Sequence, residues 1–225
     1  NIVFFSPQEL KLVRESPEER RKFMDIDISQ NNKKYFYQLS RYEKILANRN
    51  KLLKTSSSID VVKETIDIWD RELVTSAKFI AFERNKFVEN IVPYAEKAHN
   101  YISNGKEKLS LKYKCGCSVN LDENFELNMT KLLKKNLEKD FKLGYTSIGT
   151  HRDDIDIFLN DVEVKAFGSQ GQQRTVALSL KLAELENMFN INGDYPILLL
   201  DDVFSELDLD RQKRLLKFVG RTQTF

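Results

Sequence analysis

Ile-Leu-Leu-Leu-Asp-Asp, residues 197–202, is the stretch of this sequence that decides the fold. Four apolar residues in a row predict a strand that is buried on both faces, as in a parallel sheet. The strand leads directly into Asp201 and Asp202, and in open α/β sheets ligands bind beyond the carboxyl ends of the strands. One carboxylate there can hold Mg²⁺, and its neighbour can orient or deprotonate an attacking water. From this stretch alone, a strand that ends in polar turn residues remains an alternative.

A second motif lies shortly before this strand. Gly-Ser-Gln-Gly-Gln-Gln-Arg, residues 168–174, opens a helical pattern whose apolar stripe runs from Leu178 through Leu182 and Leu185 to Phe189. Small and hydroxyl-bearing residues at a helix N-terminus leave backbone N–H groups facing outward, where a phosphate can bind. An ordinary N-cap is the simpler explanation of this motif alone. The order of motif, helix, turn, apolar strand and Asp-Asp is more informative than either motif.

This order resembles the ABC-type ATPases. Residues 169–172 are similar to their signature motif, residues 197–202 to Walker B with the catalytic acid, and residues 205–208 to the D-loop. Two positions depart from the commoner pattern, because Gln170 replaces a glycine and Asp202 replaces a glutamate. The resemblance implies these roles: Asp202 as the catalytic acid; Asp201 for Mg²⁺; Ser169, Gln170, Gly171 and Gln172 for the nucleotide of a partner subunit; and Ser205 and Asp208 in the D-loop.

Further motifs narrow the resemblance to the RecF family of bacterial recombination-repair proteins, an SMC-like branch of these ATPases. The matching segments are 4–7, 10–13, 16–21, 39–42, 149–154 and 167–174. Thr150 departs from the family, which usually has proline there. The resemblance implies an ATP-dependent homodimer that acts as a clamp on DNA at gaps or single/double-strand junctions, with ATP and Mg²⁺ as cofactors. It also implies partnership with RecR and RecO in loading RecA, in the cytoplasm.

The predicted fold is therefore α/β, a truncated ABC-type ATPase head with an inserted helical lobe. Residues 1–30 are expected to end the first ATPase lobe, residues 31–142 to form the helical lobe, and residues 143–225 to carry the signature, Walker B and D-loop. Helical patterns on either side of a break at Thr55–Ser58 predict a short antiparallel arm, with a kink or split at Pro93. SMC heads carry a very long coiled coil at this place.

Composition excludes several classes of protein. The 225 residues are 41% hydrophobic and 31% charged, without an apolar run that could cross a membrane and without a visible signal peptide. The net charge is only +2, so any DNA contact must come from local patches. Cys115 and Cys117 are spaced for neither a structural disulfide nor a four-ligand zinc site, which fits a reducing cytoplasm.

No G-x-x-x-x-G-K-[ST] phosphate loop occurs in the sequence, which starts without methionine in a predicted strand and ends where another strand should begin. Both ends look cut. We therefore expect this chain alone to hydrolyse ATP poorly or not at all, because no residue holds the β- and γ-phosphates.

Two groups of residues are candidate ligand contacts. Short helices after Ser6-Pro7 and Ser16-Pro17 carry a basic group that can meet DNA phosphates, although a solvated helix face explains it equally well. Its members are Lys11, Arg14, Arg20 and Arg21. In the stretch 151–154, His151 and Arg152 are candidate contacts to nucleotide or DNA; a turn network of ion pairs is the alternative.

Three other readings of the function stay open. The chain can be a non-catalytic DNA-binding or dimerisation module, or another SMC-like ATPase head. Alternatively, Asp201 and Asp202 can combine with Asp153 and Asp154 in a two-metal phosphodiesterase site, although no histidine pattern supports one.

Overall fold

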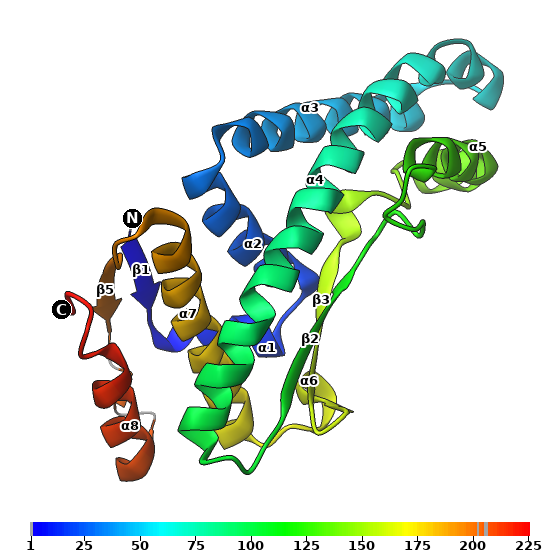
Figure 1. The fold of residues 1–225 in the computed structure, drawn as a ribbon. Helices are drawn as coiled ribbons and strands as arrows, with labels where there is room; N and C mark the ends of the chain where they lie inside the picture. Colours follow the sequence, from blue (N-terminus) through cyan, green and yellow to red (C-terminus); the bar gives the residue numbers. More distant parts are fainter. Residues whose placement is uncertain (1, 202, 205–206) are drawn as a thin grey trace. The chain divides into compact units, whose positions relative to one another are not determined.

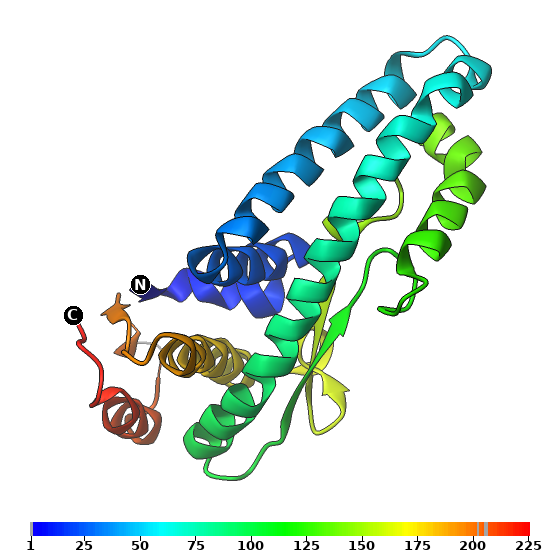
Figure 2. The same cartoon turned by 45° about the horizontal axis from the view of Figure 1, so that its top comes forward.

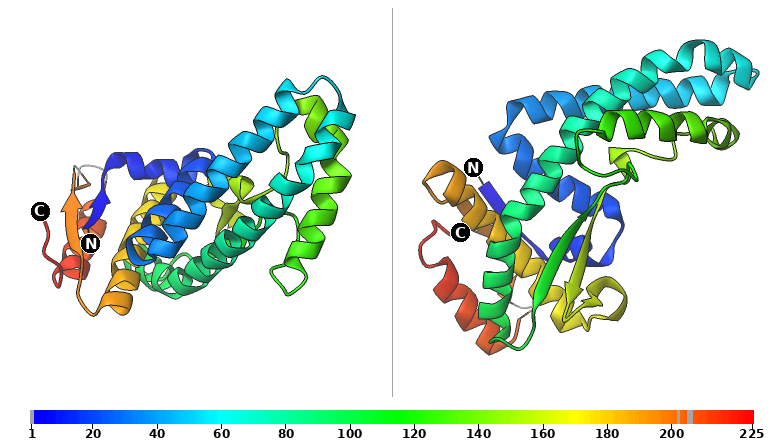
Figure 3. Two further views of the ribbon diagram at one scale, coloured as in Figure 1. Left: turned by 90° about the horizontal axis from the view of Figure 1, so that it is seen from above. Right: turned by 45° about the vertical axis from the view of Figure 1, so that its right-hand side comes forward.

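The strand predicted at residue 197 is present and paired in the computed structural model, which describes residues 2–201, 203–204 and 207–225 (Figure 1). β5 (Ile197–Leu200) runs parallel to β1 (Ile2–Phe5), with Ile2 opposite Ile197 and Phe5 opposite Leu200. Thr224 forms a parallel bridge to Leu198, so an extended segment begins after Gly220 as predicted. Both ends of the chain lie beside this pair of strands (Figure 3).

Two compact units interleave along the chain. Unit 1 comprises Asn1–Asp27, Lys86–Tyr113 and Ile155–Phe225, and unit 2 comprises Ile28–Asn85 and Lys114–Asp154. The sequence predicted three consecutive segments instead. The difference arises because one long helix, α4 (Ile59–Ser103), contributes residues to both units.

The elements of unit 1 follow the capping signals of the sequence. Ser6 accepts a hydrogen bond from the Gln8 N–H, and the hairpin after β3 turns through Asn160 and Asp161, whose φ angles of 49° and 64° fit a type I′ turn. Its second strand stops at Glu163, because a short helix follows. The elements are η1 (Pro7–Leu10), α1 (Lys11–Arg14), α2 (Pro17–Asn31), a β2-β3-β4 sheet (Leu109–Lys114, Asp154–Leu159, Val162–Glu163), α6 (Val164–Phe167), α7 (Gln170–Asn192) and α8 (Leu209–Val219).

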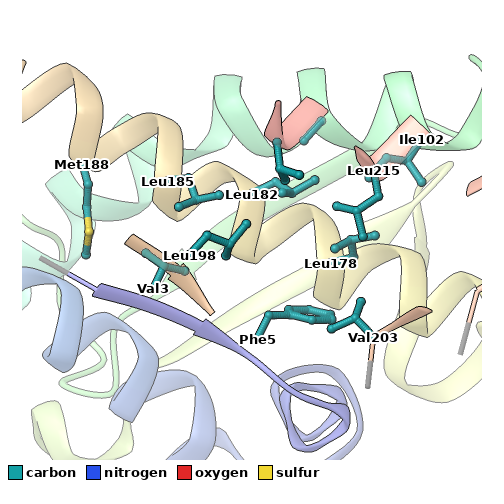
Figure 4. Packing of buried hydrophobic residues seen from close by; sticks show 12 residues of the cluster. Val3, Phe5, Ile102, Leu178, Leu182, Leu185, Met188, Leu198, Val203 and Leu215 are labelled. Atoms are coloured by element: carbon teal, nitrogen blue, oxygen red, sulfur yellow. The ribbon is translucent and has the colours of Figure 1, made fainter. Parts of the chain in front are cut away.

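The core of unit 1 lies between α7 and the parallel strands. Figure 4 shows Leu182 and Leu185 of α7 near Val3 and Leu198 of the strands, with Leu178 of α7 nearer to Phe5, and Leu178, Leu182, Leu185, Val3 and Leu198 are buried. Full burial of such a side chain contributes about 1.5–3 kcal/mol. The predicted stripe of α7 is thus confirmed over these leucines.

Phe189 differs from the sequence-based expectation, and of the two outcomes expected at Pro93, a kink or a split, the split does not occur. Phe189 is 38% exposed and stacks on Tyr195, with ring centroids 4.2 Å apart. Pro93 lies inside α4 without splitting it. The buried neighbours Ile91 and Ala95 explain this, because their packing offsets the hydrogen bond that proline removes.

Unit 2 contains the predicted antiparallel arm. α3 (Lys33–Thr55) and the part of α4 in this unit run side by side (Figure 2). The polar pairs between them show that the two helices are antiparallel, because residue numbers rise along one and fall along the other. The pairs are Asn32 with Glu83, Arg41 with Glu72 and Arg49 with Asp70. α5 (Phe125–Leu143) is followed by Gly144, whose left-handed φ of 71° ends the helix. None of the described helices is both long and apolar enough to cross a membrane.

A buried arginine joins the three helices of unit 2. The Arg49 guanidinium is fully buried and donates to Asp70 Oδ1 at 2.7 Å, Asp140 Oδ2 at 3.0 Å and Thr146 Oγ1 at 2.9 Å. These acceptors come from α4, from α5 and from the segment after α5. Since a buried charge is tolerated only when it is paired, this cluster fixes how the helices pack.

Arg49→Met should lower the free energy of unfolding by about 3–5 kcal/mol, because it leaves two buried carboxylates without their cation. Denaturant unfolding measures the change. Arg41→Met, on the same helix, is the matched control: its ion pair with Glu72 is solvent-exposed, so we expect a loss of at most about 1 kcal/mol. Equal losses in the two variants would contradict the role of the buried cluster.

A second buried polar cluster lies between α2 and α7 of unit 1. Lys181 pairs with Glu184 there, near the buried Asp27. Burial and, after it, the neighbouring Glu184 carboxylate raise the pKa of Asp27 to about 8, although Lys181 acts in the opposite direction. The folded protein therefore keeps a proton on Asp27 at neutral pH.

Asp27→Asn should reduce the loss of stability on raising the pH from 5 to 8. Because the folded pKa is raised, the contribution of Asp27 is fully present below the unfolded pKa and is lost as the pH rises toward 8. Each unit of difference in pKa corresponds to about 1.4 kcal/mol. Thermal unfolding at both pH values tests this, with the exposed Asp194→Asn as control. A pH dependence unchanged from wild type would contradict it.

Candidate functional site

The carboxyl ends of the parallel strands meet the first turns of α7. Asp201 follows β5, is exposed, and donates its backbone N–H to Phe5 O at 2.9 Å. A small hollow beside the strand ends is lined by Ser6, Arg174 of α7 and Val203, among others. Asp202 lies outside the described residues. The structure thus places the Asp201 carboxylate at the edge where ligands of parallel sheets bind.

The N-terminus of α7 has the form of an anion site. Ser169 is the N-cap: its Oγ accepts from the Gln172 N–H at 3.3 Å, while Gln172 Oε1 accepts from the Ser169 N–H at 2.8 Å. Because Ser169 Oγ acts as acceptor in this capping box, its own hydrogen can point to an external oxygen. The N–H groups of Gln170 and Gly171, which begin the helix, have no acceptor within it. Together these donors suit a phosphate.

The D-loop end adjoins this helix start. A Cβ on Gly171 would lie 3.6 Å from Arg211 Nη1, and Arg211 donates to Asp208 from its backbone N–H and from Nη1, both at 2.9 Å. The backbone hydrogen bond from Arg211 is the main cause that lowers the pKa of Asp208. Asp208 is also the N-cap of α8. Ser205 lies outside the described residues.

Both ends of the Gln172 side-chain amide form hydrogen bonds within the protein. Besides accepting from Ser169, it donates from Nε2 to Glu107 Oε1 at 3.0 Å. The resemblance implied that Gln172 contacts the nucleotide of a partner subunit. In the structure, its side chain connects the N-terminus of α7 to Glu107. The sequence analysis did not identify Glu107, because its partner Gln172 is 65 residues away and motifs report only on residues that are near in sequence.

His151 and Arg152 of unit 2 have different surroundings. His151 Nε2 donates to the Thr146 carbonyl at 3.1 Å, so its Nδ1 accepts from the Tyr42 hydroxyl at 2.7 Å. Burial raises the pKa of Tyr42, which keeps this hydroxyl protonated. Both ring nitrogens of His151 are thus used within the unit. Arg152 is exposed, with its guanidinium carbon 5.5 Å from the centre of the Tyr145 ring, and it can reach a ligand.

Asp153 belongs to a buried ion-pair network. Arg84 donates to Asp153 Oδ2 at 2.7 Å, and the Gly116 N–H donates to Oδ1 at 2.7 Å. Arg84 also donates to the Tyr35 hydroxyl and to the Thr150 carbonyl. The turn network considered for residues 151–154 is therefore present around Asp153, with partners from α3 and α4.

This network disfavours a metal ion. Among the described residues, the one group of three or more metal-ligand side chains is Cys115, Cys117 and Asp153, with ligand atoms within 4.8 Å of one another. Both oxygens of Asp153 already accept hydrogen bonds, one of them from the cationic Arg84. A hydrogen bond with Cys115 raises the pKa of the Cys117 thiol well above its usual value. Because both oxygens of Asp153 are already used within the protein, the cluster offers no support for a phosphodiesterase site.

The basic group of unit 1 divides into exposed and structural members. Lys11 is exposed, whereas Arg20 is 5% exposed and donates to the carbonyls of Leu12 and Glu15. Arg14 Nε donates to Gln173 Oε1 at 2.7 Å, and Arg21 is half-buried. The burial of Arg20 argues against a DNA contact there; Lys11 keeps an available charge.

Comparison with known proteins gives a consistent set of relatives. The chain is 43% identical over 225 residues to the DNA replication and repair protein RecF of Clostridium beijerinckii, covering 100% of this chain and 60% of the relative. It is 44% identical over 227 residues to RecF of Ruminiclostridium cellulolyticum, covering 99% of this chain and 61% of the relative. The chain thus spans about 60% of the length of these curated relatives. No family model matches the sequence.

Solved structures agree with this result. The recombination mediator protein RecF-ATPrS in the RecFOR pathway matches with a TM-score of 0.88 and 38% identity, over 100% of this chain and 61% of that one. The RecF-ATP structure matches with the same TM-score and 37% identity, again over 100% of this chain and 61% of that one. The fold of this chain is therefore that of the corresponding part of RecF, and the predicted ABC-type class is confirmed.

Proposed function

Because this chain belongs to the RecF family, matching RecF proteins along its whole length, we propose that the complete protein is an ABC-type ATPase that clamps DNA during recombinational repair. The observation that supports this best is the anion site at the start of α7. Ser169 and the first N–H groups of the helix lie beside Arg211 and Asp208, as a signature motif and D-loop should.

The residues present fit ATP and Mg²⁺. Asp201 offers an exposed carboxylate at the end of β5, and oxygen ligands are what Mg²⁺ prefers. Bound Mg²⁺ would neutralise charge on the phosphates. Asp202 would orient the attacking water, while Ser169 and Gly171 would donate to the γ-phosphate of a nucleotide held by the partner subunit. The chain by itself is expected to turn over little ATP, because its sequence lacks a phosphate loop.

The finer proposal concerns partners. ATP would drive formation of a two-fold dimer on DNA at gaps or strand junctions, where the protein would act with RecO and RecR to load RecA in the cytoplasm. The solved RecF structures are described as part of the RecFOR pathway, which supports this choice. The other candidate, a DNA-binding module without catalysis, is favoured only if DNA binding proves strong and independent of nucleotide.

Ser169→Arg in the full-length protein should abolish ATP-dependent dimerisation and reduce ATP turnover at least tenfold, with ATP binding by the monomer unchanged. The reason is that the introduced side chain fills the place of the partner's γ-phosphate. Analytical ultracentrifugation with and without ATP measures the dimer. Ser57→Arg, at an exposed turn of the arm, is the control. Normal dimerisation of Ser169→Arg would overturn the assignment.

Lys11→Glu should weaken DNA binding to a similar degree for different sequences. It should also reduce the slope of log affinity against log salt by about 1, because Lys11 is proposed to contact a phosphate. Fluorescence anisotropy across a salt series measures both effects. Lys63→Glu, an exposed lysine of α4, is the matched control. A salt slope equal to that of wild type would remove Lys11 from the proposed DNA contact.

A further inference from the structure

We propose that Glu107 is a positioning residue for the signature motif, and that it acts on the nucleotide site of the partner subunit. The inference rests on the proposed function. The Glu107 carboxylate joins two helices that are distant in sequence: it accepts from Gln172 Nε2 at 3.0 Å through Oε1 and from His99 Nε2 at 3.1 Å through Oε2. Gln172 in turn fixes the backbone N–H of Ser169 at 2.8 Å.

The far end of this chain of hydrogen bonds is anchored in the core of unit 1. His99 of α4 is fully buried, and its Nδ1 lies 3.1 Å from Ser179 Oγ of α7. Ser179 Oγ is also 2.7 Å from the Thr175 carbonyl. The Glu107 side chain is itself only 17% exposed. The N-terminus of α7 is therefore connected through Glu107 to the buried His99, in addition to its own cap.

The hydrogen bonds in the cluster have a definite direction. A carboxylate only accepts, so His99 Nε2 must carry the hydrogen that it shares with Glu107. The Ser179 hydroxyl donates its hydrogen to the Thr175 carbonyl, which leaves its oxygen free to accept from His99 Nδ1. Burial lowers the pKa of His99, and the hydrogen bond with Glu107 opposes this shift. Glu107 thereby receives a donor on each oxygen, which holds its carboxylate in one orientation.

The cluster also borders the D-loop. A polar hollow of about 220 Å³ is lined by Glu107 together with Asp208, Arg211 and Arg214, among others. Arg211 is the residue that approaches Gly171 at the start of α7. Glu107 thus contacts the first turn of α7 through Gln172 and lines one hollow with Asp208, the last residue of the D-loop.

Loss of Glu107 should disturb what the signature does and leave the protein's own ATP binding intact. In Glu107→Ala, Gln172 loses its anchor and the capping box that presents Ser169 loosens. Full-length Glu107→Ala should dimerise with ATP at least tenfold more weakly than wild type, with unchanged monomer affinity for ATP. Glu163→Ala, an exposed residue of β4, is the control.

A swap of the two side chains keeps the test valid if Glu107→Ala folds poorly. Gln172→Glu alone places two carboxylates against each other and should weaken dimerisation. Gln172→Glu combined with Glu107→Gln should restore it: the introduced carboxylate accepts from the Ser169 N–H and from the introduced amide, whose oxygen accepts from His99. Failure of the double variant to recover would overturn the proposal.

Mixed dimers distinguish action on the partner's site from a general structural effect. With Glu107→Ala in one subunit and Asp202→Asn in the other, both defects fall on one nucleotide, so about half of the wild-type turnover should remain. With both changes in the same subunit, its own nucleotide lacks the Asp202 carboxylate and the partner's nucleotide faces the altered signature. Both sites are then defective, so turnover should be lost. Equal turnover in the two arrangements, or the reverse order, would overturn the inference.

The wild-type protein separates the two levels of the proposal. If it fails to dimerise with ATP, the proposed function is wrong and this inference falls with it. If wild type dimerises and Glu107→Ala does so equally well, the function stands and only the role of Glu107 is wrong.

Discussion

The pairing of β5 and its packing against α7 form the constraint on which the rest of unit 1 depends. Its backbone pairs with β1 on one edge and with Thr224 on the other, while α7 covers it with a row of leucines. Leu198 is buried under these leucines, while the other three residues of β5 are half-buried, and all four are apolar, so the nearest carboxylate follows the strand. This places Asp201 at the carboxyl end, beside the first turns of the helix that packs on the strand.

The same packing sets the position of the signature motif. α7 runs back across the strands before β5 begins, so its N-terminus lies at the edge where β5 ends. The cap at Ser169 then satisfies the helix start without using the serine hydrogen. A feature that stabilises the helix thereby also prepares a donor for an anion. Local stability and the proposed binding role are served by the same atoms.

Buried charges organise both units in a similar manner. In unit 2, Arg49 and Arg84 each collect acceptors from separate segments of the chain. In unit 1, Glu107 collects donors from α4 and α7. A buried charge with several partners costs much free energy when a partner is missing, so such clusters select one arrangement of the helices.

The sequence by itself determined the features that depend on neighbours in the chain. These are the apolar strand before Asp201, the cap at Ser169, the αL end at Gly144, the turn at Asn160-Asp161 and the order of motifs that indicates the RecF family. Only the tertiary structure decided the role of polar side chains whose partners are distant in sequence. Arg20 is buried, His151 bonds to Tyr42, and Gln172 bonds to Glu107. Hydrophobic periodicity reports which face of a helix is buried, but a hydrogen bond between residues 65 or 109 positions apart is set by how the helices pack.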